Sequence, residues 1–204
     1  MKPPWFWIVA GPNGSGKTTL VRSGALAGVI GPLPDASFNP DDIARTLREQ
    51  MPAATELDLV RRAQAHSDGQ VDQAILARRS FLVETVLSSD KFRARVTEAL
   101  AGGFRIGLVF VTLRAAALHV ARIADRVIDG GHDVPEDRVL ARRVRSHAAF
   151  GWFAARAHRG LLIDNTGGPD LAADGPVLVA EKSDGQQAWQ VYRPDLYPDL
   201  TAAL

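Results

Sequence analysis

The stretch IVAGPNGSGKTTL, residues 8–20, decides the fold. An apolar run leads into a glycine-rich turn, which is followed by Lys-Thr-Thr and a further apolar residue. Residues 11–18 satisfy the pattern G-x-x-x-x-G-K-[ST], in which glycines let several backbone N–H groups converge on one phosphate. The N-terminus of the helix expected next adds its dipole to the same anion site. The stretch therefore predicts a strand, a phosphate-binding loop (P-loop) and a helix, in that order.

Each part of this loop has an expected task. The lysine reaches the β- and γ-phosphates of a nucleotide, and the hydroxyl of Thr18 holds Mg²⁺, so the predicted cofactors are ATP and Mg²⁺. The predicted nucleotide-binding residues are Gly11, Pro12, Asn13, Gly14, Ser15, Gly16, Lys17, Thr18 and Thr19. The alternative is a glycine-rich turn that carries Lys-Thr by chance, but the strand before it and the helix after it favour the nucleotide.

Length and composition suit one α/β domain spanning residues 1–204, with 46% hydrophobic residues for its core. The 24 basic and 23 acidic side chains nearly cancel, which gives no reason to expect nucleic acid as a partner. The absence of cysteine excludes disulfides and thiolate metal sites. No apolar run approaches the ~20 residues that a membrane helix needs, and none resembles a signal peptide, so we expect a cytoplasmic protein.

The rest of the chain alternates strand and helix. Strands are expected at residues 5–10, 35–38, 81–86, 104–113 and 160–166. Helices are expected at 17–27, from Asp41 or Asp42 to 50, and at 56–78, 90–101, 115–129 and 135–158. This order predicts a three-layer α/β/α P-loop NTPase fold with a mostly parallel, five-stranded sheet. A C-terminal antiparallel hairpin is expected at 176–193, turning at 183–185, and it either extends the sheet or forms a partner surface.

Polar residues follow two of the predicted strands, where ligands of parallel sheets bind. Asn39 and Asp41 come after the second strand, and Glu84 and Thr85 end the third. Asp41 has two interpretations. It caps the next helix, or it accepts the proton of an attacking hydroxyl. A carboxylate inside an apolar strand is costly unless it reaches the open end of the sheet, so Glu84 is expected to meet substrate or Mg²⁺-bound water.

Arginines gather on the two helices around the Gly130-Gly131-His132 loop. Those on a common helix face are Arg122 with Arg126, and Arg138 with Arg142 and Arg145. Two arginine faces joined by a flexible loop suit a lid, residues 122–146, that closes on the transferring phosphate. The alternative is a set of solvated arginines paired with the nearby acidic residues. His132 is either a ligand or, more commonly for a loop histidine, a cap.

Two other classes of P-loop protein fit poorly. Transporter-type ATPases need an LSGGQ-like segment, which Ser67-Asp68-Gly69-Gln70 matches badly, and a strand ending in Asp-Glu, where this chain has Asp164-Asn165. GTPases need an Asn-Lys-x-Asp base reader, which the chain lacks. Asp164 is instead expected to end its strand and cap a turn.

Five stretches together resemble the zeta toxin family of P-loop kinases, whose wider group includes chloramphenicol phosphotransferase-like enzymes. They are GPNGSGKTT (11–19), FNPDDIAR (38–45), FLVETVLSS (81–89), GFRIGLVFVTL (103–113) and RIADRVIDGGHDVPEDRVLARRVRS (122–146). The resemblance implies ATP-dependent phosphorylation of a hydroxyl on a small molecule, which for zeta toxins is UDP-N-acetylglucosamine. It also implies an antitoxin as a partner protein, although short members of the family often have none that is recognisable.

The resemblance further implies roles for single residues. The catalytic ones are Asp41 as general base, Lys17 on the ATP phosphates, and Arg126 and Arg142 as phosphate-binding lid residues. The substrate-binding ones are Glu84, Asn39 and Thr85. Asn39-Pro40-Asp41 replaces a more acidic stretch of the well-known toxins, and no sugar-binding residues can be assigned within 46–80. The acceptor therefore stays open.

The sequence is compatible with three functions. The first is a small-molecule kinase that uses Asp41 as base. The second is a nucleotide-dependent switch that acts on a protein partner, with Asp41 as a helix cap. The third is a polynucleotide-end kinase, which needs a basic channel that the near-zero net charge does not favour.

Overall fold

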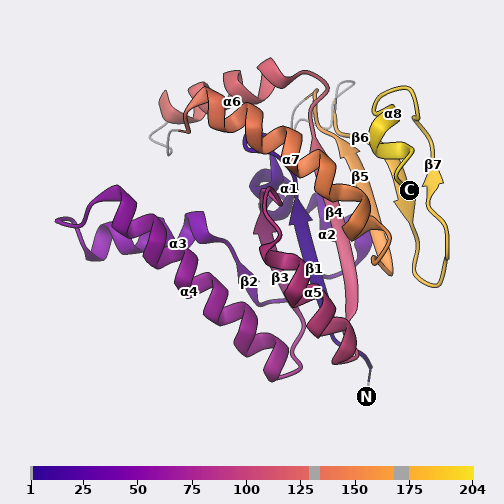
Figure 1. The fold of residues 1–204 in the computed structure, drawn as a ribbon, viewed down its shortest axis with the longest axis horizontal. Helices are drawn as coiled ribbons and strands as arrows, with labels where there is room; N and C mark the ends of the chain where they lie inside the picture. Colours follow the sequence, from indigo (N-terminus) through magenta and orange to yellow (C-terminus); the bar gives the residue numbers. More distant parts are fainter. Residues whose placement is uncertain (1, 129–133, 168–174) are drawn as a thin grey trace.

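The structure is a computed structural model that describes residues 2–128, 134–167 and 175–204 (Figure 1). Strands and helices alternate through most of the chain, as the sequence predicts. In chain order the elements are β1 (Trp5–Ala10), α1 (Lys17–Arg22), α2 (Ala25–Ile30), β2 (Ser37–Phe38), α3 (Pro40–Gln50), α4 (Glu56–Leu76), β3 (Phe81–Thr85), α5 (Lys91–Ala101), β4 (Arg105–Thr112), α6 (Ala116–Ile128), α7 (Glu136–Ala154), β5 (Arg159–Asp164), β6 (Val177–Lys182), β7 (Gln190–Val191) and α8 (Pro198–Thr201).

The strands form one seven-stranded sheet in the order β2-β3-β1-β4-β5-β6-β7. The first five in this order run parallel, which confirms the expected parallel sheet. β6 pairs antiparallel with β5, and β7 pairs antiparallel with β6. Of the two options for the C-terminal hairpin, the structure therefore has the one in which the hairpin extends the sheet.

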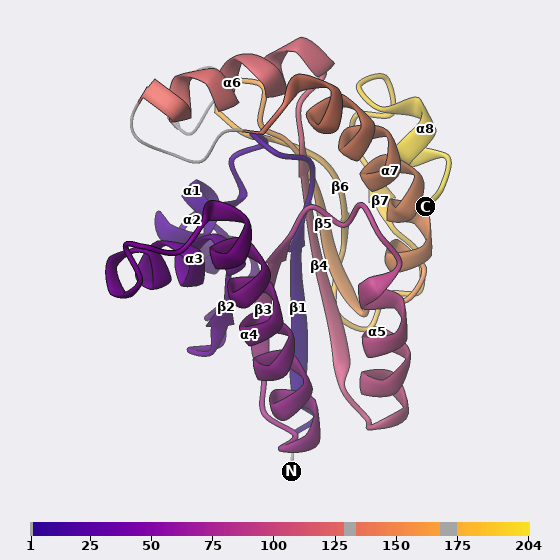
Figure 2. The same cartoon turned by 60° about the vertical axis from the view of Figure 1, so that its left-hand side comes forward.

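Strand β1 shows why the sheet lies between two helical layers. Its side chains alternate between faces, and both faces are buried. Phe6 and Ile8 join a core with residues of α4, α5 and α7, whereas Trp7 and Val9 pack with residues of α1 and α2. Helix α6 lies across the carboxyl ends of the parallel strands, and α3 with the start of α4 projects as an arm (Figures 1 and 2).

Two expected helices differ from the prediction at their ends. The helix expected at 17–27 is two short helices, because the chain turns at Gly24, whose φ of 76° lies in the left-handed region. The last long helix ends at Ala154 rather than near 158. There His158 leaves the helix and its backbone N–H donates to the carbonyl of Ile106, which starts the pairing of β5 beside β4.

The C-terminal region also differs from the prediction. The second strand of the hairpin, β7, has only two residues, and the short helix α8 was not expected. None of the helices in the described residues is both long enough and apolar enough to cross a membrane. The predicted Gly130-Gly131-His132 loop of the lid lies outside the described residues.

Candidate active site

The phosphate-binding loop is held against the neighbouring strands so closely that its glycines have no room for a side chain. Gly11 has a φ of 139°, and a Cβ there would lie 1.9 Å from the carbonyl oxygen of Val111. Gly16 has a φ of 90°, and a Cβ there would lie 2.2 Å from Nδ2 of Asn165. The loop backbone is therefore fixed between the ends of β4 and β5 while its inner side remains free to approach a ligand.

Lys17 lies at the centre of a charged cluster. Its Nζ donates hydrogen bonds to the carbonyl oxygens of Gly11, at 2.8 Å, and Pro12, at 3.0 Å. Burial lowers the pKa of Lys17 to about 8, the carboxylates of Glu84 and Asp41 oppose this shift, and the guanidinium of Arg126 adds to it. The tertiary structure thus brings together four residues that the sequence analysis selected from four different segments.

The hydroxyl of Thr18 lies beside the carboxylate of Glu84. Thr18 Oγ1 donates to Glu84 Oε2 at 2.6 Å, and Glu84 is only 8% exposed at the end of β3. Burial raises the pKa of Glu84, against the hydrogen bond from Thr18, the charge of Lys17 and the side chain of Asn39. A hydroxyl next to one carboxylate fits Mg²⁺, which takes few protein ligands and completes its shell with phosphate and water oxygens.

The described residues contain no group of three or more acidic or histidine side chains that could hold a metal ion. These residues therefore offer no metal site built from several carboxylates or histidines.

Thr85, the neighbour of Glu84, stabilises the turn that follows β3, because its Oγ1 accepts a hydrogen bond at 3.1 Å from the backbone N–H of Leu87. Leu87 has a φ of 59°, so the turn that follows Glu84 is held in a strained, left-handed conformation.

Asn39, and neither aspartate, caps α3. Its Oδ1 accepts a hydrogen bond from the backbone N–H of Asp41 at 3.0 Å, and Pro40 takes the first helical position. The expectation that the helix begins at Asp41 or Asp42, and the interpretation of Asp41 as its cap, are therefore wrong. The cap oxygen of Asn39 faces the helix, which leaves its amide group available toward Glu84.

The two aspartates after Asn39 have different surroundings. Asp42 forms ion pairs with Arg22 and, at 3.0 Å, with Arg45. The carboxylate of Asp41 is exposed and forms no hydrogen bond or ion pair with any described residue, yet its charge acts on Lys17. Asp41 is thus a free carboxylate that lies close enough to Lys17 to raise its pKa.

The two predicted catalytic arginines also differ. Arg126, near the end of α6, is close enough to Lys17 to affect its pKa. Arg142 is half-buried on α7 and forms no hydrogen bond or ion pair with the described residues. A role for Arg142 on phosphate stays a prediction.

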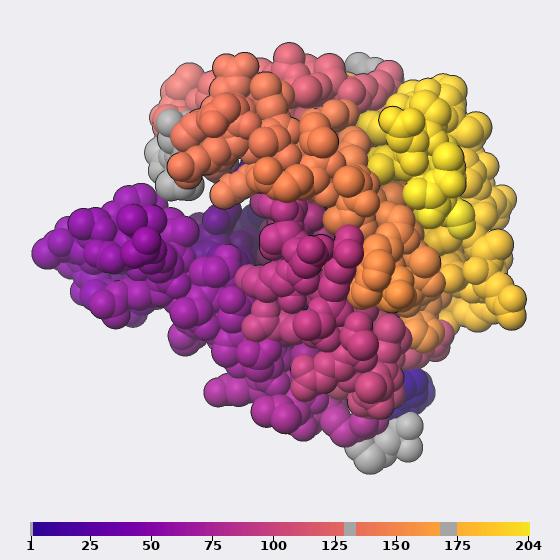
Figure 3. All heavy atoms as spheres, in the orientation of Figure 1, coloured from indigo at the N-terminus to yellow at the C-terminus, as the bar shows by residue number. Residues whose placement is uncertain are grey.

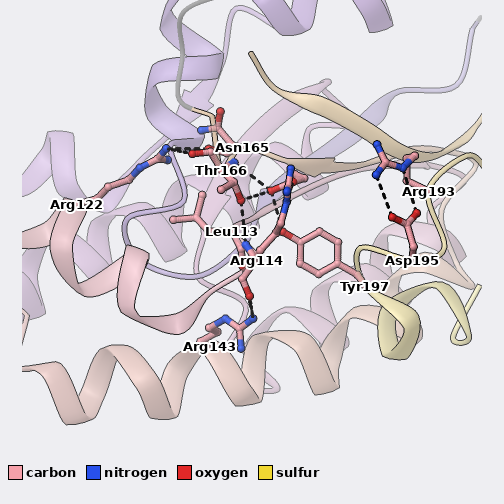
Figure 4. Close-up of polar contacts among 10 residues, drawn as sticks. Leu113, Arg114, Arg122, Arg143, Asn165, Thr166, Arg193, Asp195 and Tyr197 are labelled. Atoms are coloured by element: carbon pink, nitrogen blue, oxygen red, sulfur yellow. Dashed lines mark hydrogen bonds and ion pairs between the residues drawn. The ribbon is translucent and has the colours of Figure 1, made fainter. Parts of the chain in front are cut away.

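Other arginines of this region donate to backbone carbonyls (Figure 4). Arg122 Nη2 donates to the carbonyl oxygens of Asn165, at 2.9 Å, and Thr166, at 3.1 Å. Arg143 Nη2 donates to the carbonyl oxygen of Arg114 at 3.3 Å. Arg122 and Arg143 therefore tie α6 to the end of β5 and α7 to the end of β4, and neither matches the expected pairing with nearby acidic residues.

Two residues that the sequence analysis did not select fasten the phosphate-binding loop. His119, fully buried on α6, donates from Nδ1 to the carbonyl oxygen of Asn13 at 2.8 Å. Burial lowers the pKa of His119 to about 4, so the ring is neutral at pH 7. Asn165 Nδ2 donates to the carbonyl oxygen of Ser15 at 2.8 Å. No local pattern reveals these contacts, because each joins segments more than 100 residues apart.

The loop carries polar atoms that no described residue satisfies. The buried atoms without a hydrogen-bond partner there are Asn13 Oδ1, Ser15 Oγ and Asn165 Oδ1. Burying such groups without a partner costs free energy. Thr19, also predicted to bind nucleotide, is exposed on α1.

A second buried carboxylate, Asp164, ends β5. It accepts hydrogen bonds from Arg114 Nε at 2.7 Å, from the backbone N–H of Thr166 at 3.0 Å, and from the hydroxyl groups of Thr166 and Tyr197 (Figure 4). Burial alone would raise the pKa of Asp164, but these hydrogen bonds outweigh burial and lower it. The predicted turn cap is confirmed, and Arg114 and Tyr197 add contacts that were not expected.

The space-filling view shows a hollow on this face of the molecule (Figure 3). The arm of α3 and α4 forms one side of the hollow, and α7 forms the opposite side. Asp41 lies on α3, within the arm, and Lys17 begins α1, directly after the phosphate-binding loop. The arrangement can therefore hold a phosphate chain on the loop and a second molecule next to it.

One curated relative by sequence is an uncharacterized protein of Haemophilus influenzae. It is 32% identical over 134 residues, which are 65% of this chain and 87% of the relative.

Two solved structures share the fold at lower identity. A crystal structure of AvrRxo1-ORF1:-ORF2 with ATP has a TM-score of 0.72 and 17% identity over 98% of this chain. This chain spans 64% of that longer chain. The PezAT chromosomal toxin–antitoxin system of Streptococcus pneumoniae has a TM-score of 0.54 and 14% identity, covering 80% of this chain and 68% of that one.

The family comparison agrees with the fold and with the loop. The AAA domain family matches residues 6–148, which run from β1 and the phosphate-binding loop to α7. The chain belongs to the AAA domain family.

Proposed function

We propose that this protein is an ATP-dependent kinase of the zeta toxin type. It transfers the γ-phosphate of ATP to a hydroxyl group of a small acceptor, with UDP-N-acetylglucosamine or another sugar nucleotide as the first candidate. The similarity to AvrRxo1-ORF1:-ORF2 with ATP supports ATP as the nucleotide, and the similarity to PezAT supports the likeness to a toxin–antitoxin system.

The observation that carries the proposal is the free carboxylate of Asp41. Because Asn39 caps α3, Asp41 is not needed for the helix end, and its neighbour Asp42 is engaged by Arg22 and Arg45. A kinase needs a carboxylate facing the phosphate-binding loop to accept the proton of the attacking hydroxyl. A switch protein has no such need.

Different residues perform the proton transfer and the charge stabilisation of the proposed reaction. Asp41 accepts the proton of the acceptor hydroxyl as its oxygen attacks the γ-phosphorus, and the bond to the β-phosphate oxygen breaks to release ADP. Lys17 and Arg126 stabilise the negative charge on the phosphoryl oxygens. Burial lowers the pKa of Lys17, and the negative charge of a phosphate chain bound beside it would raise that pKa.

Thr18 and Glu84 are the residues that would hold Mg²⁺. When bound there, the ion neutralises charge on the β- and γ-phosphate oxygens. Thr18 would bind it directly, and Glu84 would bind it directly or through water. Asn39 positions both acids, since it caps the helix of Asp41 and its side chain influences Glu84.

The acceptor enters from the hollow between the arm and α7. Thr85 and Asn39 are the proposed polar contacts, and Arg142 is proposed to meet the transferring phosphate when the lid closes. A protein partner is proposed as well, because both solved structures described above are complexes or toxin–antitoxin systems by their descriptions.

The test measures transfer of label from γ-³²P-ATP with Mg²⁺ to UDP-N-acetylglucosamine, other sugar nucleotides, aminoglycosides, chloramphenicol and RNA ends. Wild type is compared with Lys17→Ala, Asp41→Asn and the matched control Asp42→Asn. Asp41→Asn should lower kcat by roughly 10²–10⁴-fold, the usual contribution of a general base, with ATP affinity kept. Lys17→Ala should remove ATP binding, and Asp42→Asn should change kcat little.

The possible results separate the three functions. A labelled small molecule that requires both Lys17 and Asp41 establishes the kinase and its acceptor class. Labelled RNA ends identify a polynucleotide kinase instead. ATP binding without transfer to any acceptor, unaffected by Asp41→Asn, would support a nucleotide switch that acts on a protein partner.

A further inference from the structure

A second pocket lies at the opposite edge of the sheet from the phosphate-binding loop. Its volume is about 410 Å³, within the range of small-molecule sites. It is bounded by the start of β4, the turn between α7 and β5, and the turn between β6 and β7. β4 separates the two sites by about 25 Å, since its eight residues each rise ~3.3 Å.

Lys182, at the end of β6, is the most unusual residue of this pocket. It is only 9% exposed and lines the pocket. Among the residues that the structure describes, none forms a hydrogen bond or an ion pair with its ammonium group. The Nζ of Lys182 is not among the buried atoms that lack a partner, so its ammonium group is open to the pocket, where an anion can reach it.

The neighbouring side chains add hydrogen-bond donors. His158 Nδ1 accepts a hydrogen bond at 3.0 Å from the backbone N–H of Ile106. Burial, together with the charges of Arg105 and Lys182, lowers the pKa of His158, so the neutral ring carries its proton on Nε2 as a donor. Gln186 Oε1 accepts a hydrogen bond from the backbone N–H of Ser183, so its NH₂ group remains as a donor.

Two arginines complete the lining. The guanidinium of Arg156 lies 3.8 Å from the centre of the Trp152 ring, and only its Nη1 is engaged, by the carbonyl oxygen of Trp152. Arg105 is engaged by the carboxylate of Asp184. Among the described residues that line the pocket, none has a carboxylate. The side chains therefore offer donors and positive charge, and Asp184, which lies outside the lining, engages Arg105 alone among these cations.

We propose that this pocket binds the phosphate group of a small molecule, with Lys182 and Arg156 as its main ligands. An ammonium point charge and a planar guanidinium fork together suit a phosphate group. The proposal concerns a second site and does not depend on the kinase activity proposed for the carboxyl edge. Free inorganic phosphate and a phosphate ester of a small metabolite share the same chemistry.

The test uses the Lys17→Ala protein without added Mg²⁺, so that the phosphate-binding loop is silenced. Inorganic phosphate and ribose 5-phosphate are titrated separately by calorimetry, which distinguishes the two sources. Lys182→Met and Arg156→Gln should each weaken binding at least about tenfold, as expected for a lost charge-assisted contact. Lys182→Arg should retain most of the affinity, and Arg61→Gln, an exposed arginine on α4, should change nothing.

Thermal unfolding without phosphate provides a second readout. Lys182→Met keeps the volume of the side chain and removes a charge that has no partner among the described residues, so its Tm should stay close to that of the parent. Phosphate should raise the Tm of the parent and leave that of Lys182→Met unchanged. Equal phosphate affinity in the parent, Lys182→Met and Arg156→Gln, or no binding to the parent at millimolar phosphate, would overturn the proposal.

Discussion

Glu84 and Asp164 are both buried carboxylates at the carboxyl edge of one sheet, yet their environments shift their pKa in opposite directions. Glu84 is 8% exposed, accepts a hydrogen bond from Thr18, and has a raised pKa because of its burial. Asp164 is 0% exposed, and its hydrogen bonds from Thr166, Arg114 and Tyr197 outweigh burial and lower its pKa.

The opposite pKa shifts distinguish a carboxylate that stabilises the fold from one that is available to bind a ligand. Asp164 has its donors in the protein, so its charge is satisfied whether or not a ligand is present. Glu84 is under-satisfied within the protein, and a cation at Thr18 would supply what it lacks. Both are polar residues at a strand end, so position in the strand alone does not separate them.

The largest effect is expected for Asp164→Asn. Loss of the charge that three side chains contact should lower the free energy of unfolding by about 3 kcal/mol. For a chain of this size that corresponds to a fall in Tm of roughly 6–12 °C. Asp195→Asn is the matched control, because Asp195 pairs with Arg193 at the surface and its substitution should change Tm little. Equal losses from both variants would remove the distinction between the two carboxylates.

Glu84→Gln should affect activity and leave stability intact. Loss of the carboxylate at the proposed Mg²⁺ site should lower phosphate transfer by about 100-fold, while Tm does not fall. Glu98→Gln on the exposed side of α5 is the control for charge and should be silent. A drop in Tm like that of Asp164→Asn, with transfer unchanged, would show that Glu84 is structural.

The two carboxylates should also respond oppositely to pH. Because the pKa of Asp164 is lowered from 3.8 in the folded protein, its stabilisation is present above that value and is lost as the pH falls through the lowered pKa. Because the pKa of Glu84 is raised from 4.5, its contribution is present below that value and is lost as the pH rises through the raised pKa.

Tm curves of the variants measure this difference. As the pH rises toward 3.8, wild type should gain stability relative to Asp164→Asn, and as the pH rises above 4.5 it should lose stability relative to Glu84→Gln. Curves that move in the same direction for both pairs would contradict the opposite shifts.

The smallest effect is expected for Tyr197→Phe. It removes one hydrogen bond to Asp164, of 2.9 Å, and should lower the free energy of unfolding by about 1.5 kcal/mol. Tyr192→Phe is the control, since Tyr192 donates to Glu181 at the surface. In the Asp164→Asn background the cost of Tyr197→Phe should shrink, and full additivity would argue against a direct coupling.

Much of the fold follows from local patterns. The apolar run of β1, the glycines of the loop and the alternation of strand and helix predict the parallel sheet, because they depend on backbone conformation and on periodic burial. The start of α3 was predicted wrongly, since Asn39 and the two aspartates are all good caps and local chemistry does not choose between them. The break at Gly24 and the early end of α7 depend on how each helix packs on the sheet.

The loop residues Lys17 and Thr18, and the acids Asp41 and Glu84, could be selected from the chain alone, because glycine-rich turns and polar strand ends have few other uses. Their mutual contacts could not, and neither could the hydrogen bonds of His119 and Asn165 to the loop or that of Tyr197 to Asp164. A hydrogen bond between segments far apart in the chain leaves no local pattern, because its free energy depends on distance and burial after folding. Residue type and spacing thus specify which chemistry is available, and packing determines which carboxylate is satisfied and which is left for a ligand.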